Sequence, residues 1–329
     1  MSRVLVTGAN GFLGSWLTRR LLSEGHQVYA LVRRSSDLSE LDGVKCEYLY
    51  GDITDLSSLE NATQKIDTVF HTAGLVAYQK SERSQMERVN VTGTQNVLTA
   101  CQKNSVRKLI HISSVVAIGA GFTRGEILSE SSEYNVGRLN LGYFETKRAA
   151  ELLVIEASKS GQVDSVILNP STIYGPGDAR KGSRKTQIKV ARGEFKFYTS
   201  GGINIVDIED VLDGILSAWR IGKSSERYIL CGENWLIKDL FTEIAKIADC
   251  PPPPYRMPDT LLHLLGNIGD QFSDWGLPFP VSKENAWTAS LFHWFTSDKA
   301  QRELNFKPRP SIEALKKSIL WMKDNDYLL

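Results

Sequence analysis

Short apolar runs rich in β-branched residues alternate with longer helix-like segments through the first half of the chain. A run of three to five such residues, bounded by polar residues or glycine, is typical of a strand that is buried on both faces of a sheet. These runs predict six strands, at residues 4–7, 28–32, 48–50, 68–71, 109–112 and 165–168. Between them, helices are predicted at residues 15–24, at about 86–103 and from about 143 onward.

This alternation of strands and helices indicates the fold class. Parallel strands that are joined by helical crossovers form a sheet that helices cover on both faces. We therefore predict an α/β fold with a doubly wound parallel sheet of the Rossmann type. In that architecture ligands bind outside the carboxyl ends of the strands, so the candidate chemistry is expected there.

The alternation ends near residue 175. Residues 181–196 are basic, residues 259–295 are rich in aromatic side chains, and residues 251–254 are four consecutive prolines. We interpret residues 1–175 as a dinucleotide-binding domain and residues 176–329 mainly as a smaller, substrate-binding lobe.

Two segments of the second half have a more specific interpretation. Residues 201–225 are expected to belong to the first domain, because residues 205–211 predict a strand that returns to the sheet and starts another helix. Residues 311–323 predict a closing amphipathic helix with Ser311 as its N-cap. The inward positions of this helix are Ile312, Leu315, Ile319 and Met322.

Composition and charge exclude several classes of protein. Lys and Arg total 39 and Asp and Glu total 38, so the net charge of +1 gives no electrostatic case for a nucleic-acid partner. The apolar runs are too short to span a bilayer, and no secretory signal precedes the first predicted strand. The four cysteines include no C-x-x-C pair, which argues against a zinc site and a disulfide framework. We therefore expect a cytoplasmic protein without a metal site that acts on a small molecule.

The residues Thr7–Gly14 form the strongest motif of the first domain. They follow a predicted strand, open a predicted helix and place three glycines at G-x-x-G-x-x-G spacing. Glycine allows a tight turn and a close approach to a pyrophosphate, and the helix N-terminus offers free N–H groups. The strand–turn–helix context favours a dinucleotide site over an ordinary glycine-rich turn. The residues expected to bind the cofactor here are Gly8, Asn10, Gly11, Phe12 and Leu13.

The end of the second predicted strand indicates which dinucleotide binds. An NAD site usually has Asp or Glu there, which accepts a hydrogen bond from the ribose 2′-hydroxyl. This chain has Arg33 and Arg34, followed by Ser35 and Ser36. Guanidinium groups can bind the oxygens of a 2′-phosphate, and this run has no carboxylate that would repel it. The pattern predicts NADP(H) as the cofactor, and the alternative is a solvated basic turn.

Two further strand ends carry candidates for cofactor binding. Asp52 either bonds the adenine amino group or caps the next turn, and Ile53 is expected to pack on the adenine ring. His71 is a lone histidine in an apolar strand, which favours a buried structural role over catalysis. The residues that follow it are small enough to let this strand end lie against the cofactor, namely Thr72, Ala73 and Gly74.

A tyrosine and a lysine four residues apart, Tyr143 and Lys147, lie on one face of a predicted helix. A free tyrosine has a pKa near ~10, which is too high for a proton shuttle at neutral pH, and a nearby cation lowers that pKa. The same lysine can bond the nicotinamide ribose. Surface Tyr–Lys pairs are common, but the glycine-rich turn upstream and Ser113-Ser114 at a strand end favour a catalytic pair.

Taken together, these motifs resemble the extended short-chain dehydrogenase/reductase family over nearly the whole chain. The resemblance is carried by Thr7–Gly14, His71–Gly74, Ser113-Ser114, Tyr143–Lys147 and Asn169–Asp178. Within that family the chain is most similar to dihydroflavonol 4-reductase-like proteins and to hopanoid-associated sugar epimerases, through residues 201–211 and 228–234.

The resemblance implies a catalytic triad. Tyr143 is the implied acid and base, and Lys147 is implied to tune it and to hold the ribose. Ser114, the last hydroxyl of the serine run, is implied to hydrogen-bond the substrate oxygen. Asn90 matches a family asparagine near the active site, and its alternative role is to bond helix backbone.

The resemblance extends to residues beyond the triad. Pro170 and Thr172 match the segment that runs past the nicotinamide and are expected to contact the cofactor. Tyr174 either lines the substrate pocket or fills core. A basic group downstream either binds a diphosphate or forms a solvated face, and it consists of Lys181, Arg184, Lys185 and Lys189.

The leading functional interpretation is the NADPH-dependent reduction of a ketone or aldehyde. Sugar-nucleotide epimerases of this family often have an acid after the second strand and keep NAD bound, whereas residues 32–34 contain no acid. The alternatives are a nucleotide-sugar epimerase or dehydratase that uses transient oxidation, and a non-catalytic dinucleotide sensor. The resemblance also implies a homodimer in which helices near 87–103 and 143–158 pair across a two-fold axis.

Overall fold

The computed structural model describes residues 1–180, 184–277 and 279–328. Its centre is a seven-stranded parallel sheet with the strand order β10-β6-β5-β4-β1-β2-β3. The strands are β1 (Arg3–Thr7), β2 (Gln27–Val32), β3 (Glu47–Tyr50), β4 (Thr68–His71), β5 (Lys108–Ile112), β6 (Ser165–Pro170) and β10 (Arg227–Leu230). The six predicted strands and the doubly wound α/β fold are confirmed, and β10 is a further strand that the apolar pattern did not predict.

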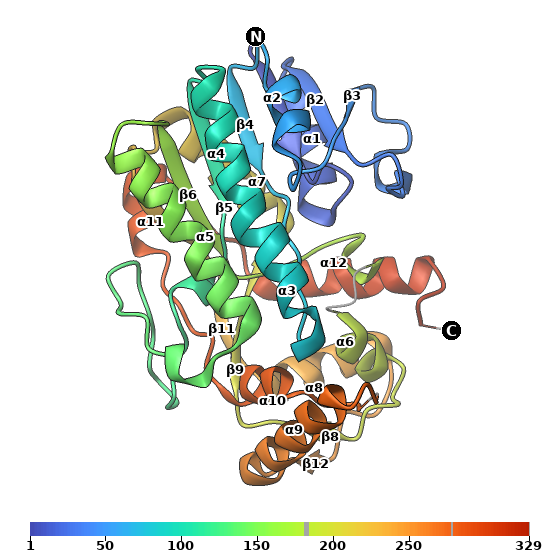
Figure 1. The fold of residues 1–329 in the computed structure, drawn as a ribbon. Helices are drawn as coiled ribbons and strands as arrows, with labels where there is room; N and C mark the ends of the chain where they lie inside the picture. The colour runs from blue at the N-terminus through green and yellow to red at the C-terminus, as the bar shows by residue number, and fades with distance from the viewer. Residues whose placement is uncertain (181–183, 278, 329) are drawn as a thin grey trace.

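Helices cover both faces of this sheet (Figure 1). On one face lie α1 (Phe12–Ser23) and α7 (Ile208–Ile221) with α11 (Asp298–Leu304), and on the other lie α2 (Leu56–Ala62), α4 (Gly93–Lys103) and α5 (Gly142–Lys159). Because side chains alternate along a strand, Val4 and Val6 of β1 join the first core and Leu5 joins the second. All three are fully buried, as expected for a parallel sheet that is covered on both sides.

The helix predicted at about 86–103 is longer and less regular than expected. It consists of α3 (Arg83–Met86), a π-helical segment (Glu87–Thr92) and α4. π-helical turns are rare and occur frequently at functional sites. This one includes Arg88, which lines a cavity at the candidate site, and Asn90, whose side chain forms hydrogen bonds there.

A second sheet has three strands in the order β11-β9-β7. They are β7 (Thr172–Tyr174), β9 (Gly202–Asp207) and β11 (Glu233–Leu236). The prediction that residues 205–211 return to the main sheet is therefore wrong for the strand, because β9 pairs with β7 and β11. It is correct for the helix, because α7 packs on the main sheet. The strand is excluded from the main sheet because β10 already occupies the edge beside β6.

The remaining elements complete the C-terminal lobe. They are α6 (Lys185–Ala191), β8 (Phe197–Tyr198), α8 (Ile237–Ala248), β12 (Tyr255–Arg256), α9 (Asp259–Asp274), α10 (Lys283–Ser290) and α12 (Ser311–Asp324). Of these, α9, α10, β8 and β12 lie at the end of the molecule farthest from the N-terminus (Figure 1). None of the described helices combines the length and the apolar character that a bilayer crossing requires.

The closing helix α12 differs from its prediction at one position. It begins at Ser311, so Pro310 is its N-cap and the prediction of Ser311 as N-cap is wrong. The Ser311 hydroxyl instead donates to the carbonyl oxygen of Ile205 in β9 (2.6 Å), which attaches the helix to the second sheet. The predicted inward face is confirmed, with Leu315, Ile319 and Met322 buried and Ile312 partly buried.

Candidate active site

The glycine-rich turn between β1 and α1 packs closely against the end of β4. Gly8 has a positive φ of +69°, and a Cβ on it would lie 2.7 Å from the Cα of Ala73. A Cβ on Gly14 would lie 2.1 Å from the carbonyl oxygen of Gly8. Only glycine therefore fits at both positions. Gly11 is the N-cap of α1 and provides no side-chain cap, so the first N–H groups of the helix remain suited to an anion.

A cavity of about 290 Å³ opens at the carboxyl ends of β1 to β4, and we call it the sheet-edge cavity. It brings together nine of the predicted cofactor residues, namely Gly8, Asn10, Gly11, Arg33, Asp52, Ile53, Thr72, Ala73 and Gly74. The other predicted cofactor residues are not among those that line it, namely Phe12, Leu13, Arg34, Tyr143, Lys147, Pro170 and Thr172. Gln85 and Arg88 also line it, although nothing in their local sequence indicated a site. The fit to a dinucleotide rests on the backbone turn and on the position of this cavity in the fold.

The two arginines after β2 have different surroundings. Arg33 lines the sheet-edge cavity together with Ser36. The guanidinium of Arg34 instead lies 4.9 Å from the centre of the Tyr50 ring. The next acid along the chain, Asp37, accepts hydrogen bonds from the backbone N–H (2.9 Å) and the hydroxyl (3.1 Å) of Ser39.

Asp52 and Ile53 follow the end of β3, where the sequence predicts contacts with the adenine. Asp52 Oδ1 accepts hydrogen bonds from the backbone N–H (2.8 Å) and the hydroxyl (2.9 Å) of Thr54, so it caps this turn. It also lines the sheet-edge cavity, where an adenine contact stays a prediction. Ile53 is buried, and its side chain packs against Gly93 at the start of α4.

His71 has the structural role that the sequence predicts. Its Nδ1 lies 2.8 Å from the Thr7 hydroxyl and its Nε2 lies 3.1 Å from the Thr94 hydroxyl. Burial, and to a smaller extent the charge of Lys147, lowers the pKa of His71 to about 3. The imidazole is therefore neutral at physiological pH, and it ties β1 to α4 across the end of β4.

Tyr143 stands in the first turn of α5, beside Ser114 at the end of β5. Burial raises the pKa of Tyr143 to about 12, the neighbouring Ser114 side chain acts in the opposite direction, and the charge of Glu284 raises it further. The edge of the Tyr78 ring also meets the Tyr143 ring, with centroids 6.2 Å apart. Tyr78 and Glu284 were not among the residues that the sequence motifs indicated.

Lys147 does not act on the tyrosine in this arrangement as predicted. We expected it to lower the pKa of Tyr143, but Nζ of Lys147 donates to the carbonyl oxygen of Ile112 (2.9 Å). Burial lowers the pKa of Lys147 to about 8, and the charge of Glu151 opposes this. An amine with this pKa remains mostly protonated at pH 7, and its hydrogen bond keeps it at the end of β5.

The two serines of the β5 end have distinct partners. The Ser113 hydroxyl donates to Glu151 Oε2 (2.6 Å), whereas Ser114 faces Tyr143. Glu151, which is fully buried in α5, also accepts hydrogen bonds from Asn169 Nδ2 (2.5 Å) and from Arg227 Nη1 (3.0 Å). This network fixes α5 against β5, β6 and β10, and it includes the Ser113 hydroxyl but not that of Ser114.

Asn90 joins the loop after β4 to α5. Its side-chain oxygen accepts from Leu75 N (2.7 Å), and its amide donates to Leu75 O (2.9 Å) and to the Thr146 hydroxyl (3.1 Å). The side chain thus bonds loop backbone, rather than the helix backbone that one of the two interpretations predicts.

The basic segment near residue 184 is not a single surface. Arg184 is buried, its guanidinium lies 3.8 Å from the centre of the Tyr174 ring, and it pairs with Asp178 (3.1 Å). Tyr174 is fully buried in the core of the C-terminal lobe, so it fills core. Lys185 and Lys189 are exposed, and Lys181 lies outside the described residues.

Neither cysteines nor acidic clusters suggest other chemistry within the described part of the chain. All four cysteines have free thiols. The described residues contain no group of three or more His, Cys, Asp or Glu side chains arranged to hold a metal ion.

Comparisons with known proteins agree with this architecture. The model of the NAD dependent epimerase/dehydratase family matches residues 4–231. A dihydroflavonol 4-reductase-like protein from Synechocystis sp. is 31% identical over 98% of this chain and 95% of its own length. Sterol demethylase protein B from Methylococcus capsulatus is 29% identical over 97% of this chain and 98% of its own length. The crystal structure of gox2253 superposes with a TM-score of 0.89 at 31% identity and covers 100% of both chains.

Proposed function

The chain belongs to the NAD dependent epimerase/dehydratase family, and we propose that within this family it is an NADPH-dependent reductase of a ketone or aldehyde. The observation that carries the proposal is the placement of Ser114 beside Tyr143 at the carboxyl end of the sheet, with Lys147 one helical turn further on. This is the set of groups that hydride transfer to a carbonyl carbon requires, because negative charge then develops on the carbonyl oxygen. The similarity to a dihydroflavonol 4-reductase-like protein supports the direction of reduction.

The preference for NADPH is supported by the end of β2. Arg33 and Ser36 line the sheet-edge cavity there, and the carboxylate of Asp37 is engaged with Ser39. When bound, NADPH supplies the hydride. In this proposal the turn Gly8–Leu13 holds the pyrophosphate through backbone N–H groups, and Arg33 and Arg34 hold the 2′-phosphate. Pro170 and Thr172 remain proposed contacts of the nicotinamide end.

Tyr143 donates the proton to the substrate oxygen in this proposal, and Ser114 donates a hydrogen bond to the same oxygen. A phenol whose pKa is about 12 is a weak acid, so it needs a nearby cation to act at neutral pH. In this proposal Lys147 is that cation, and its ammonium, which donates to Ile112 O in this structure, has to turn toward the phenol and the ribose to act.

The second candidate is a nucleotide-sugar epimerase or dehydratase, which the description of the matching family favours. Purified protein that carries firmly bound NAD(H) would support this candidate. Protein that binds added NADPH and oxidises it with a carbonyl compound would support the reductase. A screen of ketones and aldehydes for NADPH oxidation therefore separates the two.

We propose that the protein assembles as a homodimer. We also propose that it is cytoplasmic, that it acts on a small molecule and that it has no nucleic-acid partner. α5 has an outward face that includes Leu152, whose side chain is 45% exposed, and this face lies beside α4. Pairing of α4 and α5 with a second copy would cover it. Light scattering at micromolar concentration should give about twice the chain mass of 36.7 kDa, and a mass near 36.7 kDa would contradict the dimer.

The test of the proposed chemistry is Tyr143→Phe. This change removes the hydroxyl and keeps the ring that packs against Tyr78. We expect kcat to fall at least ~10²-fold, because general acid catalysis typically contributes about 10²–10⁴-fold, while folding and NADPH binding persist. Ser114→Ala should have a lower upper limit of about 10³-fold, since one hydrogen bond to a developing charge contributes roughly 2.7–4 kcal/mol at most. If Tyr143→Phe folds, binds NADPH and keeps a kcat close to that of the parent, the proposed mechanism is refuted. Another proton donor or the non-catalytic dinucleotide sensor would then have to be considered.

A further inference from the structure

The catalytic helix α5 has no N-terminal cap within its own segment. Leu141 is the N-cap residue and provides no side-chain hydrogen bond. The first N–H groups of any helix lack intrahelical partners, so Gly142 and Tyr143 need acceptors from elsewhere. Because Tyr143 is one of these residues, whatever accepts its N–H also helps to fix the position of its phenol.

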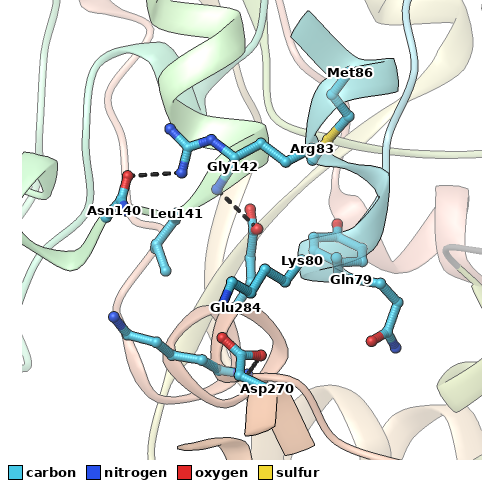
Figure 2. A pocket seen from close by; sticks show the side chains of 11 residues that line it. Gln79, Lys80, Arg83, Met86, Asn140, Leu141, Gly142, Asp270 and Glu284 are labelled. Carbon is cyan, nitrogen blue, oxygen red and sulfur yellow. Dashed lines mark hydrogen bonds between the residues drawn. The ribbon is translucent and has the colours of Figure 1, made fainter. Parts of the chain in front are cut away.

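Glu284 provides both acceptors from the other half of the chain. Its Oε2 accepts the N–H of Gly142 (2.9 Å) and its Oε1 accepts the N–H of Tyr143 (2.8 Å). Figure 2 shows the carboxylate reaching the start of α5 from the C-terminal lobe. The residue lies in α10, 142 positions after Gly142, and its side chain is buried.

The surrounding contacts hold this carboxylate in place. Ser282 caps α10 by accepting from Asn285 N (3.1 Å), and its hydroxyl donates to the backbone oxygen of Tyr78. The start of α10 is therefore attached to the residue whose ring meets Tyr143. A Cβ on Gly142 would lie 2.9 Å from Met86 Cε and 3.4 Å from Glu284 Oε2, so the start of α5 is packed against both side chains.

A second contact fixes the same junction from α3. Arg83 Nη1 donates to Asn140 Oδ1 (2.7 Å), and Asn140 is in the left-handed region with a φ of +53° (Figure 2). One residue before the helix, Asn140, and the first two residues inside it are thus held from different elements. The chain between them has little freedom to shift the tyrosine.

We propose that Glu284 is a positioning residue that fixes the first turn of α5 from the C-terminal lobe and thereby aligns the Tyr143 hydroxyl with Ser114 for proton transfer. This inference rests on the proposed function for its catalytic consequence. It links the lobe expected to bind the substrate to the proton donor, because a movement of α10 would be transmitted directly to the backbone of Tyr143.

The charge of Glu284 is set by groups on every element that packs around it. Arg83 of α3, Asp270 of α9 and Lys283 of α10 line the cavity of about 500 Å³ beside it, together with Lys80 and Tyr78, and Tyr143 faces it from α5. Burial raises the pKa of Glu284 to about 7, while its hydrogen bonds from the Tyr143 and Gly142 N–H groups oppose the shift. Near neutral pH the carboxylate therefore gains a proton and accepts these two hydrogen bonds less strongly.

The experiment compares Glu284→Gln with Glu156→Gln. The first keeps the shape of the side chain but loses one of its two acceptors and its charge. The second makes the same chemical change at an exposed position of α5. For Glu284→Gln we expect kcat to fall about tenfold or more, since small misplacements of a catalytic group are costly, with the Kd for NADPH within about twofold. The fall of kcat toward acid pH near pH 7 that we expect of the parent should be absent in this variant.

Two further measurements, hydrogen exchange and the kinetics of Glu284→Asp, test the positioning role of Glu284 independently. Hydrogen exchange of the peptide that spans residues 141–146 should be faster in Glu284→Gln and unchanged in Glu156→Gln. Glu284→Asp retains the charge and should keep the pH dependence with a smaller loss of kcat, and it carries the test if Glu284→Gln fails to fold. Parental kcat and pH dependence in folded Glu284→Gln, or parental exchange, would overturn the inference. If the parent reduces no carbonyl compound, the proposed function fails and the exchange comparison alone decides the role of Glu284.

Discussion

The two cavities described above are built from different kinds of groups. The sheet-edge cavity is lined largely by backbone and short side chains at the carboxyl ends of four adjacent strands. The inter-lobe cavity, which lies beside Glu284, takes five of its eleven lining residues from charged side chains on separate elements, namely Lys80, Arg83, Asp270, Lys283 and Glu284. Backbone geometry determines the shape of the sheet-edge cavity, whereas the inter-lobe cavity depends on charged side chains that come from elements distant in sequence.

This difference determines what each cavity tolerates. Around the sheet-edge cavity, a Cβ on Gly8 would meet backbone atoms, which cannot move without moving β4. Around the inter-lobe cavity, the pair Lys80–Asp274 (2.7 Å) is half-exposed on both sides, and such pairs contribute little stability. The exception is Glu284, which is buried. We infer that the first cavity resists change, whereas the second can vary except at this carboxylate.

Among the substitutions that test this difference between the two cavities, Gly8→Ala is expected to have the largest effect on stability and NADPH affinity. Its φ of +69° and the 2.7 Å approach to Ala73 Cα act together. A left-handed conformation costs an L-residue roughly 1–2 kcal/mol and overpacking costs about 1–3 kcal/mol, so we expect a total of about 4 kcal/mol. This cost should be divided between the free energy of unfolding, measured in urea, and the affinity for NADPH, measured by fluorescence titration.

Gly43→Ala is the matched control for that change. Gly43 has a φ of +73°, but a Cβ there would meet nothing within 4 Å. Only the conformational cost of roughly 1–2 kcal/mol is therefore expected, without a loss of NADPH affinity. Equal effects of the two substitutions would show that close packing does not define the sheet-edge cavity.

The next effect concerns the stability cost of the Glu284 charge. Its pKa is about 7 in the folded protein against an ordinary value of 4.5, so the folded state binds the proton more tightly. Its contribution to stability is therefore fully present below about pH 4.5 and is lost as pH rises to about 7 and above. At about 1.4 kcal/mol per pH unit, the parent should lose about 3 kcal/mol relative to Glu284→Gln between pH 4 and 8.

Urea unfolding of both proteins across this pH range measures that difference directly. Glu156→Gln serves again as the exposed control, and its difference from the parent should not vary with pH in this way. A pH-independent difference between the parent and Glu284→Gln would mean that the buried carboxylate has an ordinary pKa. The expected result would mean that the charge is retained at a cost to stability, as is common for functional groups.

The same contrast explains what could be predicted from the sequence. The turn at Gly8 and the pair Tyr143 and Lys147 are local patterns, whereas the choice of Ser114 over Ser113 came from the family resemblance. In the structure Ser114 lies beside Tyr143, and Gly8 lines the sheet-edge cavity. Glu284 could not be predicted, because it follows its partners by 141 and 142 residues and stands in an ordinary helical sequence.

Two differences between the predictions and the structure have the same physical origin. Lys147 does not lower the pKa of Tyr143 in this arrangement, because Ile112 O competes for the ammonium group, and the spacing of the two residues does not show this competition. The position of β9 was inferred from its apolar pattern, which does not show that β10 already fills the sheet edge. In both cases a partner distant in sequence decides the outcome, and local patterns contain no information on it.

The smallest expected effect concerns the two arginines after β2, at the rim of the sheet-edge cavity, and the affinity that each contributes for NADPH. Arg33 lines the cavity, whereas the guanidinium of Arg34 lies over the Tyr50 ring, where a cation–π contact holds it. Both side chains are exposed, so substituting either one should not alter the fold. Their surroundings differ enough to expect unequal contributions to the binding of a 2′-phosphate.

We expect the parent to bind NADPH at least tenfold more tightly than NADH, a difference of about 1.4 kcal/mol, and Arg33→Ala to remove most of it. Arg34→Ala should remove less, because this guanidinium must first leave the Tyr50 ring before it can reach the phosphate. Since NADH lacks the 2′-phosphate, its Kd should be the same in all three proteins. Fluorescence titrations with both cofactors measure these values. Equal affinities of the parent for NADPH and NADH would disprove the cofactor preference, and a larger effect of Arg34→Ala would reverse the assignment of the two arginines.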